Sequence, residues 1–103
     1  MTRISGSGPA YVALLIDALE RAAIAQGLPA NLARDLVITT LIGTADMIDV
    51  TGEEPTELAA AVQSPGGTTE RAVAVLEQAG MADMFDRAVR AAIERAAELR
   101  DGV

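Results

Sequence analysis

Apolar residues recur along the chain every three or four positions, the spacing that places them on one face of an α-helix. Clusters of glycine and proline interrupt this pattern, as in GLP at residues 27–29 and PGG at residues 65–67. No segment alternates apolar and polar residues with a period of two, so no β-strand is expected. We therefore predict an all-α bundle of about five helices, running from SGSGPAY to Gln26 and near residues 30–50, 56–62, 69–79 and 81–100.

The first predicted helix is apolar around most of its circumference. Its polar residues Asp17, Glu20 and Arg21 form one narrow stripe, and the rest of its surface is largely apolar. Such a helix is normally buried on more than one side. The chain has 103 residues, of which 50% are hydrophobic but only 2% aromatic, and its many alanines bury little area each. We therefore expect a second copy of the chain to cover this helix in a homodimer.

The charge balance and the missing residue types exclude several classes of function. The chain carries 15 acidic and 8 basic residues, a formal net charge of −7. Nucleic acids and anionic membranes require a basic face, so neither is expected as a partner. The sequence contains no cysteine and no histidine, so no disulfide, thiolate site or metal site is expected. No signal peptide and no bilayer-spanning apolar run is visible, and we expect a cytoplasmic protein.

The loop QSPGGTT lies directly before the fourth predicted helix and has the composition of an anion pocket. The first N–H groups of a helix lack internal partners, and the helix dipole places partial positive charge there. Gly66 and Gly67 would let a carboxylate or phosphate approach closely, and the hydroxyls of Ser64, Thr68 and Thr69 could add hydrogen bonds. A simpler alternative fits as well, in which one threonine caps the helix and the glycines only form the turn.

The other glycines predict structure rather than chemistry. Gly6 and Gly8 of SGSGP form neither a phosphate-binding loop nor a dinucleotide fingerprint, because no lysine follows them and the third glycine is missing. We expect Ser7 to cap the first helix at this point. Gly43 lies inside the second predicted helix, where close packing of helices explains it better than a ligand does.

These motifs occur together in one family. ISGSGPAY opens the first predicted helix, GLP ends it, and SPGGTTERAVAVLE opens the fourth. In this order and spacing the sequence resembles the C-terminal domain of pyrroline-5-carboxylate reductase, the enzyme of the last step of proline synthesis, over nearly the whole chain. Gln63 departs from the family pattern, because a small residue is more usual beside Ser64. This departure affects the edge of the loop and its fine geometry.

The resemblance implies an architecture and a substrate site. In the family this domain is helical, forms an interlocked dimer with its twin, and can assemble further into rings. The family's loop holds the carboxylate of the substrate on backbone amides, here those around Gly66, Gly67, Thr68 and Thr69, with Ser64 close by. The hydroxyl of Thr69 is implied to lie at the ring nitrogen of the substrate, which makes Thr69 the implied catalytic residue.

The resemblance also implies a reaction, the reduction of 1-pyrroline-5-carboxylate to L-proline with hydride from NADP(H) or NAD(H). Ser5, Gly6, Ser7 and Gly8 would then line the nicotinamide end of the site. The family's N-terminal Rossmann domain is absent from residues 1–103, which we expect to form one helical domain that alone binds no cofactor and is inactive. Two alternatives stay open: a stand-alone helical dimerisation module without catalytic activity, and an unrelated helical bundle.

Overall fold

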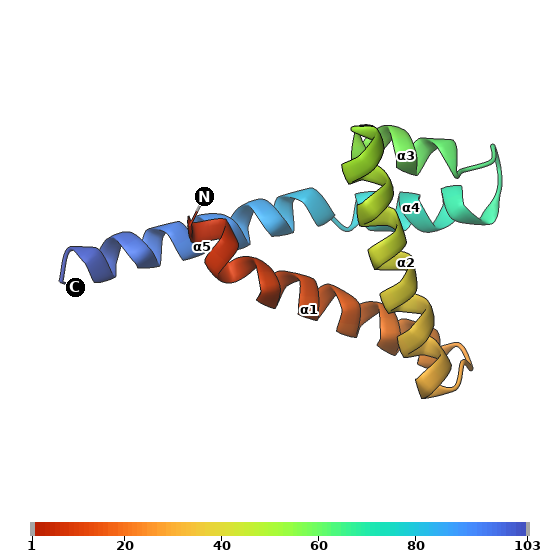
Figure 1. Ribbon diagram of the computed structural model, residues 1–103, viewed down its shortest axis with the longest axis horizontal. Coiled ribbons are helices and arrows are strands. Elements are labelled where there is room, and N and C mark those ends of the chain that lie inside the picture. Colours follow the sequence, from red (N-terminus) through yellow and green to blue (C-terminus); the bar gives the residue numbers. More distant parts are fainter. Residues whose placement is uncertain (1, 103) are drawn as a thin grey trace. The chain divides into compact units, whose positions relative to one another are not determined.

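The computed structural model describes the backbone of residues 2–102 (Figure 1) and, in addition, the side chains of residues 6–102. The elements are α1 (Thr2–Ala25), α2 (Ala30–Thr51), α3 (Pro55–Ala61), α4 (Thr68–Gln78) and α5 (Met81–Arg100). No strand occurs among the described residues, and the predicted all-α fold is confirmed. Contacts divide these residues into two units: the first is Pro9–Ala60, and the second joins the residues before Pro9 with those from Ala61 onward.

A glycine-ended turn joins α1 to α2 in the first unit. Gly27 adopts a φ of +109°, which side chains disfavour, and its N–H donates to the carbonyl of Ile24 at 2.9 Å. The N–H of Leu28 reaches back to the carbonyl of Ala23 at 3.1 Å, which completes a Schellman motif. The prediction that Gly27 follows the end of the first helix is therefore confirmed.

An ion pair and a small residue join α1 to α2. The Nε of Arg34 donates a hydrogen bond to Oε2 of Glu20, which is only 8% exposed. This hydrogen bond, together with the charge of Glu20, raises the pKa of Arg34. Next to Arg34 in sequence, Ala33 is fully buried. Of the polar stripe predicted on this helix, Asp17 and Arg21 pair with each other in solvent, whereas Glu20 is turned towards α2.

In the second unit, Gly80 connects α4 directly to α5. Its φ of +80° suits glycine, its N–H bonds back to the last turn of α4 at 3.0 Å, and its carbonyl accepts a hydrogen bond from the first turn of α5 at 2.9 Å. Along α5, Arg87 pairs with Asp83 at 2.9 Å and Arg90 pairs with Asp86 at 2.7 Å, each across one helical turn. One side of α5 is therefore polar and solvated.

The starts of α1 and α3 differ from the predicted ones. α1 begins at Thr2 rather than within SGSGP, so Ser7 lies inside the helix and the prediction that it is the N-cap is wrong. Pro9 also lies inside α1, where it removes one backbone hydrogen bond of the helix. α3 begins at Pro55, since proline suits a first helical position, and Thr56 follows within the helix. The bounds of α2 and α5 agree with prediction within the usual uncertainty of helix ends.

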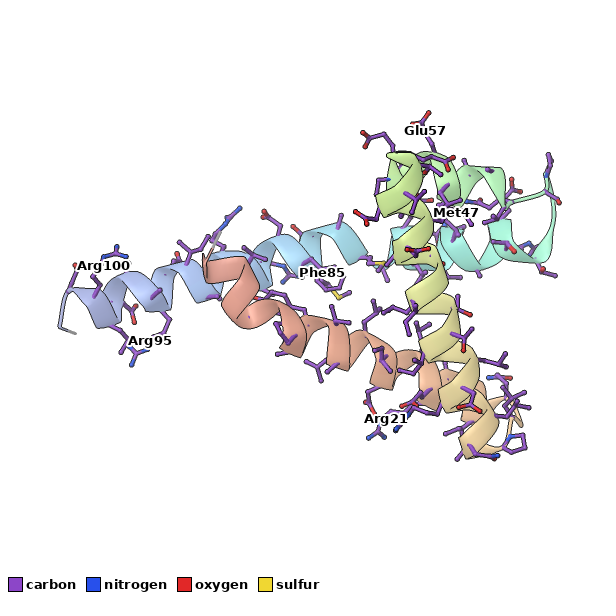
Figure 2. All side chains as sticks on the ribbon, viewed as in Figure 1. Arg21, Met47, Glu57, Phe85, Arg95 and Arg100 are labelled. Carbon is purple, nitrogen blue, oxygen red and sulfur yellow. The ribbon has the colours of Figure 1, made fainter. Side chains whose placement is uncertain are left out.

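Most apolar side chains of the single chain face solvent. Among residues 6–102, only Ala33 and Glu20 are buried. Met47 of α2 is 47% exposed and Phe85 of α5 is 37% exposed (Figure 2). At Gly43 of α2, an added Cβ atom would meet nothing within 4 Å, so the described residues show no close packing at this position. The apolar surface expected to be covered is thus left open by the single chain.

Candidate functional site

The loop before α4 is a tight turn that leads straight into the helix. The N–H of Gly67 donates to the carbonyl of Ser64 at 2.8 Å, which closes a four-residue β-turn around Pro65 and Gly66. Gly66 adopts a φ of +72°. Proline at the second position and a positive φ at the third are the features of a type II turn, which favours glycine at that third position. The order Ser-Pro-Gly-Gly therefore specifies the turn type, whereas the pattern above predicted only a turn.

Gly67 is required for a different reason, namely lack of space. It is the N-cap of α4 with φ −85° and ψ 179°, an extended conformation open to any residue. A Cβ atom added there would lie 3.0 Å from the carbonyl oxygen of Ser64 and 3.3 Å from the Cβ of Ser64. That carbonyl is held in place because it accepts the hydrogen bond of the turn. Gly67 therefore allows the start of α4 to lie close to the carbonyl of Ser64. This explanation of the glycine requires no ligand.

The N–H groups at this helix start fall into two classes. The N–H of Gly67 is used by the turn, and the N–H of Gly66 donates to Oε1 of Glu70 at 2.9 Å. The first helical hydrogen bond onto the carbonyl of Gly67 comes from one turn further along, at 3.3 Å. Within the described residues, the N–H groups of Thr68 and Thr69 thus lie ahead of the helical ladder, where no carbonyl of α4 can accept from them.

The structure brings the predicted substrate-binding residues together in this one turn and helix start. Ser64, Gly66, Thr68 and Thr69 are exposed, and Gly67 is half-buried. Two of the four predicted amides are available, and the other two are engaged within the chain. Because the N-cap is Gly67, the alternative in which a threonine caps α4 does not describe this structure.

Glu70 is the residue at this site to which the pattern assigned no role. It is the third residue of α4, and its carboxylate reaches back to an N–H group that precedes the helix. A glutamate at this position is half of the capping-box pattern, in which its side chain bonds to the N-cap N–H. Here Glu70 accepts a hydrogen bond from the N–H of Gly66, one residue before the N-cap. The sequence therefore contains the glutamate of a capping box, but this glutamate binds a different N–H group from the one that the capping box uses.

The SGSGP segment is part of α1 rather than a turn. Gly6, Ser7 and Gly8 are helical, so their backbone N–H groups serve the helix. The backbone of Ser5 is also helical, while its side chain lies outside the described residues. Residues 2–8 belong to the same unit as the loop before α4. Their place at the nicotinamide end of a site stays a prediction.

The electrostatics of the loop depend on its backbone. Residues 63–70 contain no basic side chain, and the first arginine after them is Arg71. An anion bound here would therefore be attracted by the N–H groups and by the positive end of the α4 dipole. The described residues contain no group of three or more acidic, histidine or cysteine side chains that could hold a metal ion. No described helix is both long and apolar enough to cross a membrane.

An open apolar groove of about 630 Å³ lies between α1 and α2 in the first unit. Leu19 lines it from α1, and α2 contributes side chains from Leu36 to Ile48, among which Thr40 and Thr44 are the polar ones. Leu19 and Leu36 are about half exposed, at 47% and 50%. Because no charged residue lines this groove, it is suited to an apolar partner such as a helix.

The family described as pyrroline-5-carboxylate reductase dimerisation matches residues 1–99. The chain belongs to this family. The match includes both SGSGPAY and SPGGTT, the motifs on which the resemblance depended. As its name states, the family is a dimerisation domain, so association between subunits is the property that its members share.

Named relatives match the same stretch. Pyrroline-5-carboxylate reductase from Synechocystis is 48% identical over 99 residues, covering 96% of this chain and 37% of the relative. The protein of that name from Glycine max is 44% identical over 99 residues, covering 96% of this chain and 36% of the relative. The chain therefore spans little more than a third of the length of the relatives that it matches.

Solved structures share the helical fold. Pyrroline-5-carboxylate reductase from Coxiella burnetii superposes with a TM-score of 0.91 at 43% identity, covering 95% of this chain and 36% of that one. The Plasmodium falciparum pyrroline carboxylate reductase, solved with NADP bound, gives a TM-score of 0.87 at 36% identity, covering 91% of this chain and 36% of that one. The predicted family and its helical architecture are confirmed by these matches.

Proposed function

We propose that this chain is the part of a pyrroline-5-carboxylate reductase that joins two subunits and binds the substrate's carboxylate. The parent enzyme would reduce 1-pyrroline-5-carboxylate to L-proline in proline biosynthesis. One observation carries the proposal: the N–H groups of Thr68 and Thr69 lie free at the start of α4, in a chain that matches the family over residues 1–99.

The carboxylate is bound by the backbone rather than by a cation. The N–H groups of Thr68 and Thr69 donate to its oxygens, and the exposed hydroxyl of Ser64 is near enough in sequence to add a third donor. A hydrogen bond to a charged group contributes about 1.5–3 kcal/mol, and the helix dipole adds about 0.3–1 kcal/mol in an exposed setting. These magnitudes suit a substrate that must bind and leave readily.

The hydroxyl of Thr69 is assigned to the ring nitrogen of the substrate. Thr69 follows Thr68 in the first turn of α4, so its side chain and the binding N–H groups belong to one short segment. Its O–H can donate to the nitrogen lone pair of the imine, which draws electron density from the neighbouring carbon. The chain thereby orients the C=N bond and holds the ring by its carboxylate and its nitrogen.

The hydride comes from a nicotinamide cofactor when it is bound, and NADP is the one held by the Plasmodium relative. Dinucleotide-binding folds require a βαβ unit, whereas the described residues form helices only. We therefore place cofactor binding outside residues 2–102. We expect this chain alone to leave NADPH unconsumed when pyrroline-5-carboxylate is added, and steady NADPH oxidation by the purified chain would contradict this assignment.

The substrate site is tested by amide NMR during titration with L-proline and with cyclopentanecarboxylate, which lacks the ring nitrogen. Both should shift the signals of Thr68 and Thr69. Thr69→Val should weaken proline binding by up to about tenfold, the effect of one hydrogen bond, and change cyclopentanecarboxylate binding less. If neither compound shifts these signals, the chain is better described as a helical dimerisation module without catalytic activity.

The partner that covers the open apolar surface is, in this proposal, a second copy of the chain. The groove between α1 and α2 and the exposed apolar residues of α5 are the surfaces that need cover. Exposed large apolar side chains lie on both surfaces, among them Leu36 at 50% and Ile93 at 40%. Sedimentation equilibrium should give twice the chain mass of 10.6 kDa, and a mass of 10.6 kDa at micromolar concentration would contradict the homodimer.

A further inference from the structure

The carboxylate of Glu70 already occupies the N–H of Gly66, a third amide that the family resemblance assigns to the substrate's carboxylate beside those of Thr68 and Thr69. Its Oε1 accepts from the N–H of Gly66 at 2.9 Å, directly before the start of α4. Glu70 is exposed and makes this contact across only four residues. The helix start therefore carries an acid from its own sequence.

Two carboxylates cannot share this helix start without a cost. The N–H of Gly66 has one hydrogen, so a second acceptor either replaces the first or weakens its bond. Two negative charges within a few ångströms also repel each other, and the loop has no basic side chain to offset this repulsion. Since Glu70 is exposed, its side chain can swing into water when it is displaced, and its charge is then hydrated again.

We infer that Glu70 is an internal competitor for the substrate's carboxylate: it holds the N–H of Gly66 while the site is empty and must release that N–H when an anionic ligand binds. This inference rests on the substrate site proposed above. It assigns to Glu70 a positioning role in the empty site, because its bond keeps the turn and the first turn of α4 in the geometry that Thr68 and Thr69 need. It also assigns Glu70 a role in limiting affinity.

The charge of Glu70 is what the test must isolate. Glu70→Gln keeps the length of the side chain and a carbonyl oxygen able to accept from Gly66, but removes the negative charge. Glu77→Gln is the matched control, because Glu77 is an exposed glutamate near the other end of α4 and makes no ion pair with any described residue. Both variants change the net charge of the chain equally, so general electrostatic effects cancel between them.

The measurement is a titration of the full 103-residue chain with cyclopentanecarboxylate, followed by amide NMR at low ionic strength. Glu70→Gln should lower the dissociation constant about three- to tenfold, while Glu77→Gln should stay within about twofold of the wild type. In the wild-type chain the signal of Gly66 should move with those of Thr68 and Thr69, because ligand replaces Glu70 there. A neutral analogue, cyclopentanecarboxamide, should gain nothing from Glu70→Gln.

The outcomes separate this inference from the proposed function. If wild-type chain binds the carboxylate and Glu70→Gln binds equally or more weakly, Glu70 is only a helix cap and the inference fails, while the site stands. If neither the wild type nor Glu70→Gln binds, both proposals fail. Helix content by circular dichroism shows whether Glu70→Gln is folded. Should Glu70→Gln unfold, the wild-type chain still tests the inference. If the Gly66 signal of the wild type does not move while the ligand binds, the ligand does not displace Glu70 and the inference fails.

Discussion

Gly67→Ala is the substitution that most directly tests the geometry of the loop before α4. A methyl group there would lie 3.0 Å from the carbonyl oxygen of Ser64, closer than a carbon and an oxygen normally approach. The neighbour that would have to yield is a backbone carbonyl engaged in the 2.8 Å hydrogen bond of the turn, not the flexible end of a side chain. The added group therefore opens the turn or displaces the start of α4.

The expected loss of stability follows from that overlap. Overpacking a well-packed position lowers the free energy of unfolding by about 1–3 kcal/mol. Alanine also restricts the backbone of the unfolded chain more than glycine does, which raises the free energy of unfolding by about 0.4–1 kcal/mol. At Gly66, whose φ is +72°, alanine should lower the free energy of unfolding by about 1–2 kcal/mol because it disfavours this backbone conformation, not because of a steric clash. The effect of alanine on the unfolded chain applies there as well. Asparagine separates the two causes, because it tolerates a positive φ but still carries a Cβ.

Thermal unfolding followed by circular dichroism at one fixed chain concentration measures these effects. In a domain of this size each kcal/mol lowers Tm by about 4–8 °C. Gly67→Ala and Gly67→Asn should both melt well below the wild type, whereas Gly66→Asn should melt close to it. Gly80→Asn is a control on another helix start, since Gly80 has φ +80° and open space around its Cβ position. If Gly67→Ala melts within about 2 °C of the wild type, the steric account of this glycine is wrong.

Three further predictions concern α1 and α2. Arg34→Met should lower Tm more than Arg21→Met, because the first leaves the nearly buried carboxylate of Glu20 without its partner and the second breaks a solvated pair; equal melting temperatures would contradict this. Leu36→Glu should raise the dimer dissociation constant at least about tenfold in sedimentation, by placing a charge in the apolar groove, and an unchanged constant would exclude the groove from the interface. Gly43→Ala should raise the dimer dissociation constant, because the added methyl group keeps the second copy from approaching α2 closely. If Gly43→Ala raises Tm and leaves the dissociation constant unchanged, this face of α2 contacts no second copy.

The helical spacing of apolar residues and the glycine and proline clusters predicted most of the fold, because helices and their ends are determined by residues close together in the sequence. The stop at Gly27 is a Schellman motif, built from hydrogen bonds within a few residues, and the sequence carries all of its parts. The start of α1 was mispredicted for the same reason. Ser7 and Pro9 are good signals for a first turn, but the helix continues through them to Thr2, and local preference did not decide its start.

The turn and helix start before α4 could be predicted from the sequence, whereas their hydrogen bonds could not. SPGGTT predicted a helix start, and α4 does begin at Thr68, whereas the binding of a substrate by its N–H groups stays a prediction. Which N–H groups are already engaged depends on a turn type and on one flexible carboxylate four residues away. Neither a composition argument nor a resemblance specifies where the side chain of Glu70 lies.

Two features of α2 are unfavourable for an isolated chain, and a partner would explain both. Gly43 costs about 1 kcal/mol in a helix interior relative to alanine, yet no described residue lies within 4 Å of its Cβ position. Leu36 lies two turns earlier on the same side of the helix and is half exposed beside the groove. A glycine allows a neighbouring backbone to approach closely, and an exposed leucine gains free energy when covered. In the homodimer proposed above, an apolar helix from the second copy that packs against this side of α2 would offset both costs in one event.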